Sequence, residues 1–135
     1  DETLIPTGEI RRVEGTPFDL RESGMLGRKL EELRNLTGDL GFDQNYVLNK
    51  EEDGLTLAAT LTSASSDLTM MVYTDQPGLQ LYTGQHLAKP FRPLSGLCLE
   101  TQAFPDAPNH PNFPSAILLP GETYSKRTLL KFKWN

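Results

Sequence analysis

Short runs of alternating apolar and polar residues constrain the fold of this chain more than any other feature. Alternation with a period of two places successive side chains on opposite faces of a β-strand. Ten prolines and eleven glycines fall mainly between these runs. The runs that we predict to be strands are 54–63, 68–73, 79–83, 97–101, 116–119 and 122–134, with shorter ones at 4–5 and 46–48. The pattern predicts an all-β protein with sandwich-like architecture.

Helical spacing occurs in one place only, at residues 26–35. Leu26, Leu30 and Leu33 would share one face of a helix there. We therefore expect one short helix. A turn is expected at residues 75–78, where proline and glycine follow a predicted strand.

The 135 residues contain no internal repeat, no low-complexity tract and no long linker. A single domain covering residues 1–135 is therefore predicted. Two segments, 6–23 and 102–115, lack a periodic pattern. Irregular segments of this length are usually functional or packed against another part of a protein. They are the first indication of a neighbouring polypeptide.

The composition excludes several classes of function. The net charge is −5, with 13 basic and 18 acidic residues and no basic cluster, which argues against binding to nucleic acid or an anionic membrane. No apolar run approaches the roughly 20 residues of a membrane helix. The single cysteine, Cys98, offers neither an intrachain disulfide nor a zinc framework. Together with a start at residues 1–3 that does not resemble a secretion signal, the lone cysteine predicts a cytoplasmic protein.

Three polar residues at the predicted strands are candidates for a site. Glu100 lies near the end of the run 97–101, shortly before a proline-broken loop. A carboxylate held there could act as a general base, although a surface role is commoner. Asp43 precedes a strand and could bind hydroxyl groups or cap a turn. Gln80 alternates with two leucines, so its amide could be solvated, paired in the sheet or bound to a sugar hydroxyl.

Other candidates are weaker. Asp106 is expected to stabilise its proline-rich loop. His86 and His110, the only histidines, lack the paired spacing of a metal site. No phosphate-binding glycine loop and no nucleophilic triad motif is present. No metal or organic cofactor is predicted.

Five segments together resemble the aldose 1-epimerase (galactose mutarotase) family, in the order found in that family. They are LIPTGEI (4–10), GTPFDLR (15–21), GFDQNY (41–46), QPGLQLYTG (76–84) and SGLCLETQ (95–102) with the tail PDA (105–107). The closing LPGETY (119–124) is similar to the family's final turn and strand. The similarity spans essentially the whole chain.

The resemblance implies a β-sandwich of the galactose mutarotase-like type, on which family members interconvert the α and β anomers of free hexoses. By this resemblance Glu100 is the general base for the anomeric hydroxyl. Asp43 and Gln80 are ligands of the sugar hydroxyls. The implied reaction opens the ring, rotates the C1–C2 bond and recloses the ring without a cofactor.

The chain also departs from the family, whose members are more than twice as long. The family's general-acid histidine and a second sugar-binding histidine lie before the part that resembles residues 4–10. Neither His86 nor His110 matches those motifs, so we expect a C-terminal portion of a mutarotase that lacks the acid. Either an N-terminal half or another copy of the chain is expected to cover exposed sheet edges. The alternatives are a non-catalytic carbohydrate-binding or interaction module and a relative acting on hexose 6-phosphates, for which Arg11, Arg12 and Arg92 would be available.

Overall fold

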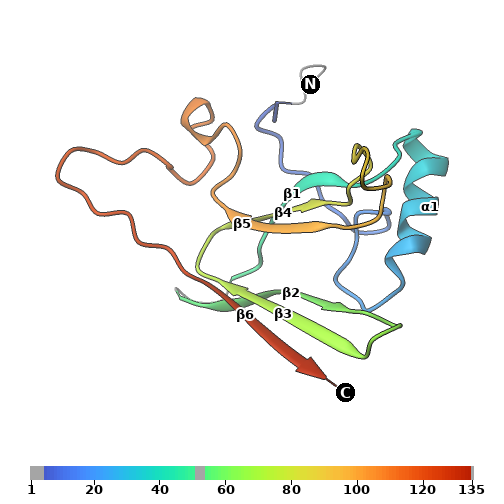
Figure 1. The fold of residues 1–135 in the computed structure, drawn as a ribbon. Helices are drawn as coiled ribbons and strands as arrows, with labels where there is room; N and C mark the ends of the chain where they lie inside the picture. Colours follow the sequence, from blue (N-terminus) through green and yellow to red (C-terminus); the bar gives the residue numbers. More distant parts are fainter. Residues whose placement is uncertain (1–4, 51–53, 135) are drawn as a thin grey trace. The chain divides into compact units, whose positions relative to one another are not determined.

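The computed structural model describes residues 5–50 and 54–134. Within these ranges strands predominate over helix, which confirms the predicted all-β class. Leu4, part of the short strand expected at 4–5, lies outside the described residues, and Ile5 is not in a strand. The elements, shown in Figure 1, are α1 (Leu26–Thr37), β1 (Asp43–Val47), β2 (Thr56–Thr62), β3 (Leu68–Thr74), β4 (Gly78–Tyr82), β5 (Cys98–Gln102), the 3₁₀ helix η1 (Ala107–Asn109) and β6 (Thr128–Trp134).

The strands form two three-stranded sheets, with the orders β1-β4-β5 and β2-β3-β6. Backbone hydrogen bonds at both ends of the pair show that β1 and β4 are antiparallel. At one end the Thr83 N–H donates to Phe42 O at 3.0 Å, and at the other the Leu48 N–H donates to Pro77 O at 3.0 Å. Leucines on β4 are buried while Gln80 between them is only half-buried, so the sheet has one apolar and one polar face, as the alternation predicted.

In the second sheet β3 is the central strand and pairs antiparallel with both neighbours. A β-bulge between Leu57 and Ala59 shifts the register of β2. The expected turn at 75–78 follows β3 and leads into β4.

The helix α1 forms where the leucine spacing predicted it. Leu33 is completely buried, and Leu26 and Leu30 are half-buried on the same face. Gly38 ends the helix with a left-handed backbone (φ 80°), and its N–H donates to Arg34 O at 3.0 Å. Only glycine adopts this conformation without strain, which explains where the helix ends. No helix among the described residues has the length and hydropathy needed to cross a bilayer.

Two strand predictions are wrong. Residues 116–119 form no strand, and the closing strand begins at Thr128 rather than at Glu122. A turn at Pro120 and Gly121 interrupts this segment, where Glu122 N–H donates to Leu119 O at 3.0 Å. β6 begins only where its register with β3 starts, at Thr74 opposite Thr128. Alternating residues therefore do not form a strand without a neighbour to pair with.

The chain divides into two compact units. Unit 1 comprises Asp1–Gly8, Asn45–Leu79 and Thr101–Asn135, and unit 2 comprises Glu9–Gln44 and Gln80–Glu100. Unit 1 buries Val72, Leu79 and Phe104, whereas unit 2 buries Leu33, Phe42 and Leu81. Asp43, Gln80 and Glu100 all belong to unit 2, so the candidate site can be described within one unit. The single domain stays a prediction.

Candidate functional site

A tight local structure places Asp43 at the start of β1. The preceding Phe42 is fully buried and packs edge-to-face on Phe18, with ring centroids 5.8 Å apart. Thr83 fixes the backbone of Phe42, because the Phe42 N–H donates to Thr83 Oγ1 at 2.8 Å. A Cβ on Gly41 would lie 2.4 Å from the same Oγ1. Glycine is therefore required at this point of the Gly-Phe-Asp segment.

Asp43 and Gln80 are hydrogen-bonded to each other across β1 and β4. Gln80 Nε2 donates to Asp43 Oδ1 at 2.8 Å. Asp43 is exposed and Gln80 is half-buried. Of the alternatives that the sequence left open for Gln80, pairing in the sheet is the one observed. The pair holds a carboxylate at the start of β1 and an amide in the middle of β4 together.

The second amide atom of Gln80 lacks a partner. Gln80 Oε1 is buried, and no hydrogen bond reaches it within the described ranges. A carboxylate only accepts hydrogen bonds, so Nε2 must face Asp43 and Oε1 must point elsewhere. A buried acceptor without a donor costs about 1–3 kcal/mol. Because this oxygen is buried, a ligand hydroxyl could donate to it and remove this cost only if the side chain moved to expose it.

Glu100 lies on β5, next to β4 in the sheet. Its side chain is exposed, whereas Leu99 before it is half-buried. Because buried Leu79 and Leu81 flank Gln80 on β4, Glu100 is on the same polar face of the sheet as Gln80. No hydrogen bond or ion pair of the Glu100 carboxylate occurs in the part of the chain that the structure describes, and it does not bond to Asp43 or Gln80. The carboxylate is thus available to a ligand.

The two histidines lie in different units. His86, in unit 2, is exposed, and its backbone N–H donates to the Tyr82 hydroxyl at 3.1 Å. His110, in unit 1, places Nε2 2.9 Å from Pro6 O and 3.2 Å from Asp106 Oδ2. The Asp106 carboxylate also accepts from Asn109 Nδ2, which agrees with its predicted role in the loop. Among the described residues no cluster of His, Cys, Asp and Glu could hold a metal ion.

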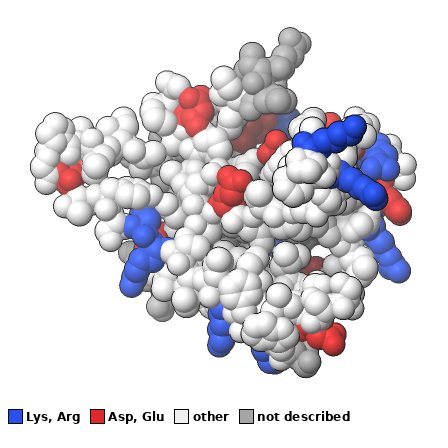
Figure 2. All heavy atoms as spheres, viewed as in Figure 1, with Lys and Arg blue, Asp and Glu red and all other residues white. Residues whose placement is uncertain are grey.

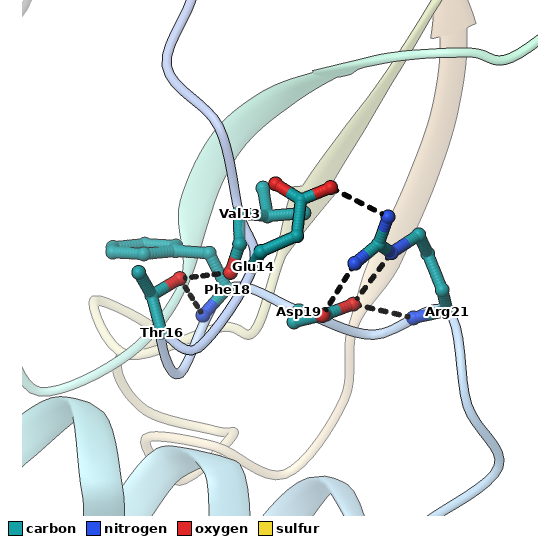
Figure 3. A network of polar contacts seen from close by, with 6 residues as sticks. All are labelled: Val13, Glu14, Thr16, Phe18, Asp19 and Arg21. Carbon is teal, nitrogen blue, oxygen red and sulfur yellow. Dashed lines mark hydrogen bonds and ion pairs between the residues drawn. The ribbon is translucent and has the colours of Figure 1, made fainter.

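Arg21, the last residue of the motif GTPFDLR, forms ion pairs with carboxylates of this chain. Arg21 donates to both carboxylate oxygens of Asp19, at 2.8 and 2.7 Å, and to Glu14 Oε1 at 2.8 Å (Figure 3). Thr16 Oγ1 accepts from the Phe18 N–H and donates to Val13 O in the same turn. The Arg21 guanidinium lowers the pKa of Asp19 from 3.8 to about 2. These contacts order a segment that sequence patterns left irregular.

The three arginines considered for a phosphate share no partner among the described residues. Arg11 is paired with Glu9 at 2.8 Å, and Arg92 is exposed. Figure 2 shows both basic and acidic side chains at the surface of the molecule. The pairing of Arg11 with Glu9 leaves its guanidinium less available to a phosphate group.

Two supporting residues were missed by sequence reasoning. Thr83 and Gln85 are buried, and Thr83 Oγ1 donates to Gln85 Oε1 at 3.1 Å beside Gly41. Thr83 directly follows β4 and Gln85 comes two residues later, and neither polar residue type predicts burial from the sequence alone. The unpartnered oxygen of Gln80 had no sequence signal, because burial of a single atom depends on tertiary packing.

Comparisons with known proteins agree with the resemblance seen in the sequence. Residues 1–131 match the sequence model of the aldose 1-epimerase family. The chain is 46% identical to galactose mutarotase from Mus musculus and 44% identical to that from Homo sapiens, each over 140 residues. It is 35% identical over 141 residues to aldose 1-epimerase from Escherichia coli K12. These alignments cover 98% of this chain and 40–41% of the relatives.

The fold is also that of a solved relative. A GalM/aldose epimerase homologue from C. elegans superposes with a TM-score of 0.85 at 28% identity. The superposition covers 99% of this chain and 42% of the other. The chain therefore spans about two fifths of the length of the relatives that it matches, and it corresponds to their C-terminal part.

Proposed function

Because this chain belongs to the aldose 1-epimerase family, we propose that it supplies the base-bearing part of a site that interconverts the α and β anomers of a free hexose, galactose or glucose. The observation that carries the proposal is the Asp43–Gln80 pair, with its unpartnered amide oxygen. A carboxylate that accepts and an amide that can accept again match the vicinal hydroxyl groups of a sugar. Sugar binding and a mutarotase reaction at these residues are our proposals.

In the proposed reaction Glu100 removes the proton of the anomeric hydroxyl while an acid protonates the ring oxygen. The bond between C1 and the ring oxygen breaks, and the open-chain aldehyde forms. Rotation about C1–C2 presents the other carbonyl face, and reclosure returns both protons. Asp43 and Gln80 hold the rest of the sugar in place during rotation. No metal or cofactor is required by this sequence of steps.

The acid is proposed to come from a second portion of polypeptide, an N-terminal half like that of the relatives. In the described part of unit 2, His86 makes no hydrogen bond to the three site residues, and in unit 1 His110 is bonded to Pro6 and Asp106. An alternative source, a second copy of the chain, would bring the same two histidines. A cytoplasmic setting is proposed as well, since the one cysteine is a free, exposed thiol.

Polarimetry of α-galactose tests the proposed reaction. The chain is combined with the remaining N-terminal portion of mouse galactose mutarotase, and the rate is compared with that of buffer. We expect a rate gain that Glu100→Gln lowers by about 10²–10⁴-fold, the usual contribution of a general acid or base. Glu31→Gln is the matched control, because Glu31 is an exposed carboxylate on α1 outside the site. No rate gain, or equal losses in both variants, would refute the proposal.

A second candidate function is sugar binding without catalysis by the chain alone. The observation that favours it is that His86, the histidine of unit 2, makes no hydrogen bond to Asp43, Gln80 or Glu100 in the described part of that unit. Calorimetric binding of galactose to the chain, with no anomerisation even in the presence of the N-terminal portion, would support this alternative. The third alternative, a hexose 6-phosphate epimerase, has less support because Arg11 is already paired with Glu9.

A further inference from the structure

β6 is an edge strand whose apolar side chains are left uncovered. It pairs on one side with β3 (Figure 1), and no other strand of the described ranges pairs with its second side. All seven residues of β6 are exposed. Leu129 is 50% exposed, Phe132 50% and Trp134 72%. A strand edge with free N–H and C=O groups and exposed apolar side chains is a template for another strand.

The two faces of β6 differ in chemistry. Alternation places Leu130, Phe132 and Trp134 on one face and Leu129, Lys131 and Lys133 on the other. An added strand would therefore need apolar side chains on the first face. On the second face it would need acidic or polar side chains opposite the two lysines, because opposite charges on adjacent strands stabilise a sheet.

A second copy of this chain fits the edge poorly. Antiparallel pairing of two β6 strands in full register would put Lys131 directly opposite Lys131 of the other copy. Like charges in that position destabilise a sheet. The charge pattern of the edge thus favours a strand of different sequence.

The lengths of the relatives indicate where such a strand comes from. This chain superposes on 42% of the C. elegans homologue with a TM-score of 0.85. More than half of that protein therefore lies outside the shared fold. We propose that the free edge of β6 docks a strand from the remaining portion of an aldose 1-epimerase polypeptide, with acidic groups facing Lys131 and Lys133. The inference rests on the proposed function, because both require that second portion.

Two leucines provide a matched test of this edge. Leu57 on β2 and Leu129 on β6 both lie opposite Tyr73 of β3, at the two edges of one sheet. They are exposed to nearly the same extent, 52% and 50%. Leu57→Asp and Leu129→Asp therefore make the same substitution at equivalent positions, both opposite Tyr73. Leu57→Asp affects the β2 edge of the sheet, and Leu129→Asp affects the β6 edge.

The experiment uses the full 135-residue chain, tagged and coexpressed with the remaining portion of mouse galactose mutarotase. We expect a complex whose dissociation constant rises at least tenfold with Leu129→Asp and less than threefold with Leu57→Asp. Hydrogen exchange of the β6 amides should slow at least tenfold in the unsubstituted complex. Lys131→Glu with Lys133→Glu should weaken the complex most at low salt. Circular dichroism checks that each variant is folded.

Several results would overturn the inference. These are no complex with the unsubstituted chain, equal weakening by both leucine variants, or a complex without protection of β6. Light scattering of the chain alone provides a further test. If the chain forms a dimer that Leu129→Asp dissociates and Leu57→Asp does not, the edge of β6 binds a second copy of the chain, and the inference is wrong. None of these readouts depends on sugar. A complex that forms normally but lacks anomerisation would therefore refute only the proposed function.

Discussion

At the scale of single residues, Gln80 has two separate roles. Its amide nitrogen fixes the Asp43 carboxylate at 2.8 Å, while its buried oxygen has no donor in the described part of the chain. A folded protein tolerates such an oxygen at a cost of about 1–3 kcal/mol. In the sugar complex that we propose, a hydroxyl group would supply the missing donor once this oxygen is exposed, and binding would recover that cost.

Gln80→Leu should accordingly weaken sugar binding much more than it changes folding. The substitution removes the bond to Asp43 but also removes the unpartnered acceptor, so the two effects on the free energy of unfolding oppose each other. A lost hydrogen bond to the sugar costs about 1.4 kcal/mol or more, which is at least tenfold in affinity. Calorimetry with galactose and urea unfolding measure the two quantities, both on the chain combined with the N-terminal portion.

Gln44→Leu is the control for this prediction. Gln44 is half-buried on β1, and its Oε1 accepts from the Asp43 N–H at 2.8 Å. Its side chain lies on the opposite face of the strand from Asp43. An equal loss of sugar affinity in both variants would show that the effect is a general disturbance of β1 and β4.

Sequence motifs located Asp43, Gln80 and Glu100 but not the relations between them. Side-chain type and family resemblance were enough to choose these three residues. The bond between Asp43 and Gln80 depends on the register of β1 against β4. Two backbone hydrogen bonds set this register, and each joins residues that are far apart in the sequence. The support of Phe42 by Thr83 likewise joins residues 41 positions apart. Contacts of this range are not encoded in local patterns.

At the scale of elements, strands were predictable where a neighbour exists. The bounds of four strands lie within two residues of the expected runs: β2, β3, β4 and β5. Each of these alternating segments has a neighbouring strand with which it pairs. Residues 116–119 alternate less clearly and have no such neighbour among the described residues. Ile117, Leu118 and Leu119 are 54–59% exposed there. Hydrophobic sequence alone therefore gave a false strand.

The segment 9–23 shows another kind of order, which comes from charge. Arg21 binds Asp19 and Glu14. Its hydrogen bonds are the largest cause of the lowered pKa of Asp19, whereas the pKa of Glu14 is lowered first by a hydrogen bond from its own backbone and then by Arg21. A carboxyl group with a lowered pKa in the folded state stabilises the fold above its unfolded pKa of 3.8. The contribution of Asp19 is lost as the pH falls through about 2. Acid should loosen this segment only under strongly acidic conditions.

Arg21→Met should return the pKa of Asp19 from about 2 towards 3.8. The guanidinium supplies the largest cause of the shift, a pair of hydrogen bonds to the carboxylate, so its removal leaves Asp19 in near-ordinary surroundings. Carboxyl carbon chemical shifts followed by NMR against pH measure the midpoint. Arg28→Met on α1 is the control and should leave the titration midpoint of Asp19 unchanged, because Arg28 makes no hydrogen bond or ion pair with Asp19. An unchanged midpoint in Arg21→Met would contradict the assignment.

At the scale of the whole molecule, the chain matches about two fifths of its relatives and exposes apolar residues on β6 and at 117–119. Its length and its motifs alone indicate a portion of a larger fold. Which edge lacks a neighbour could not be predicted, because the end of β6 and its register against β3 are tertiary properties. The candidate base, however, lies in a unit whose core is formed without that neighbour.

This arrangement predicts that sugar stabilises the molecule only when the site is complete. A ligand that binds the folded state at 100 times its dissociation constant adds about 2.7 kcal/mol to the free energy of unfolding. We expect galactose to raise the unfolding midpoint of the chain combined with the N-terminal portion. The chain alone should gain much less, because in our proposal Asp43, Gln80 and Glu100 supply only part of the hydroxyl contacts. Urea unfolding with and without galactose, with mannitol as a non-cyclising control, measures both. Equal stabilisation of the two samples would mean that unit 2 holds a complete sugar site, and the non-catalytic binding module would then be the better account.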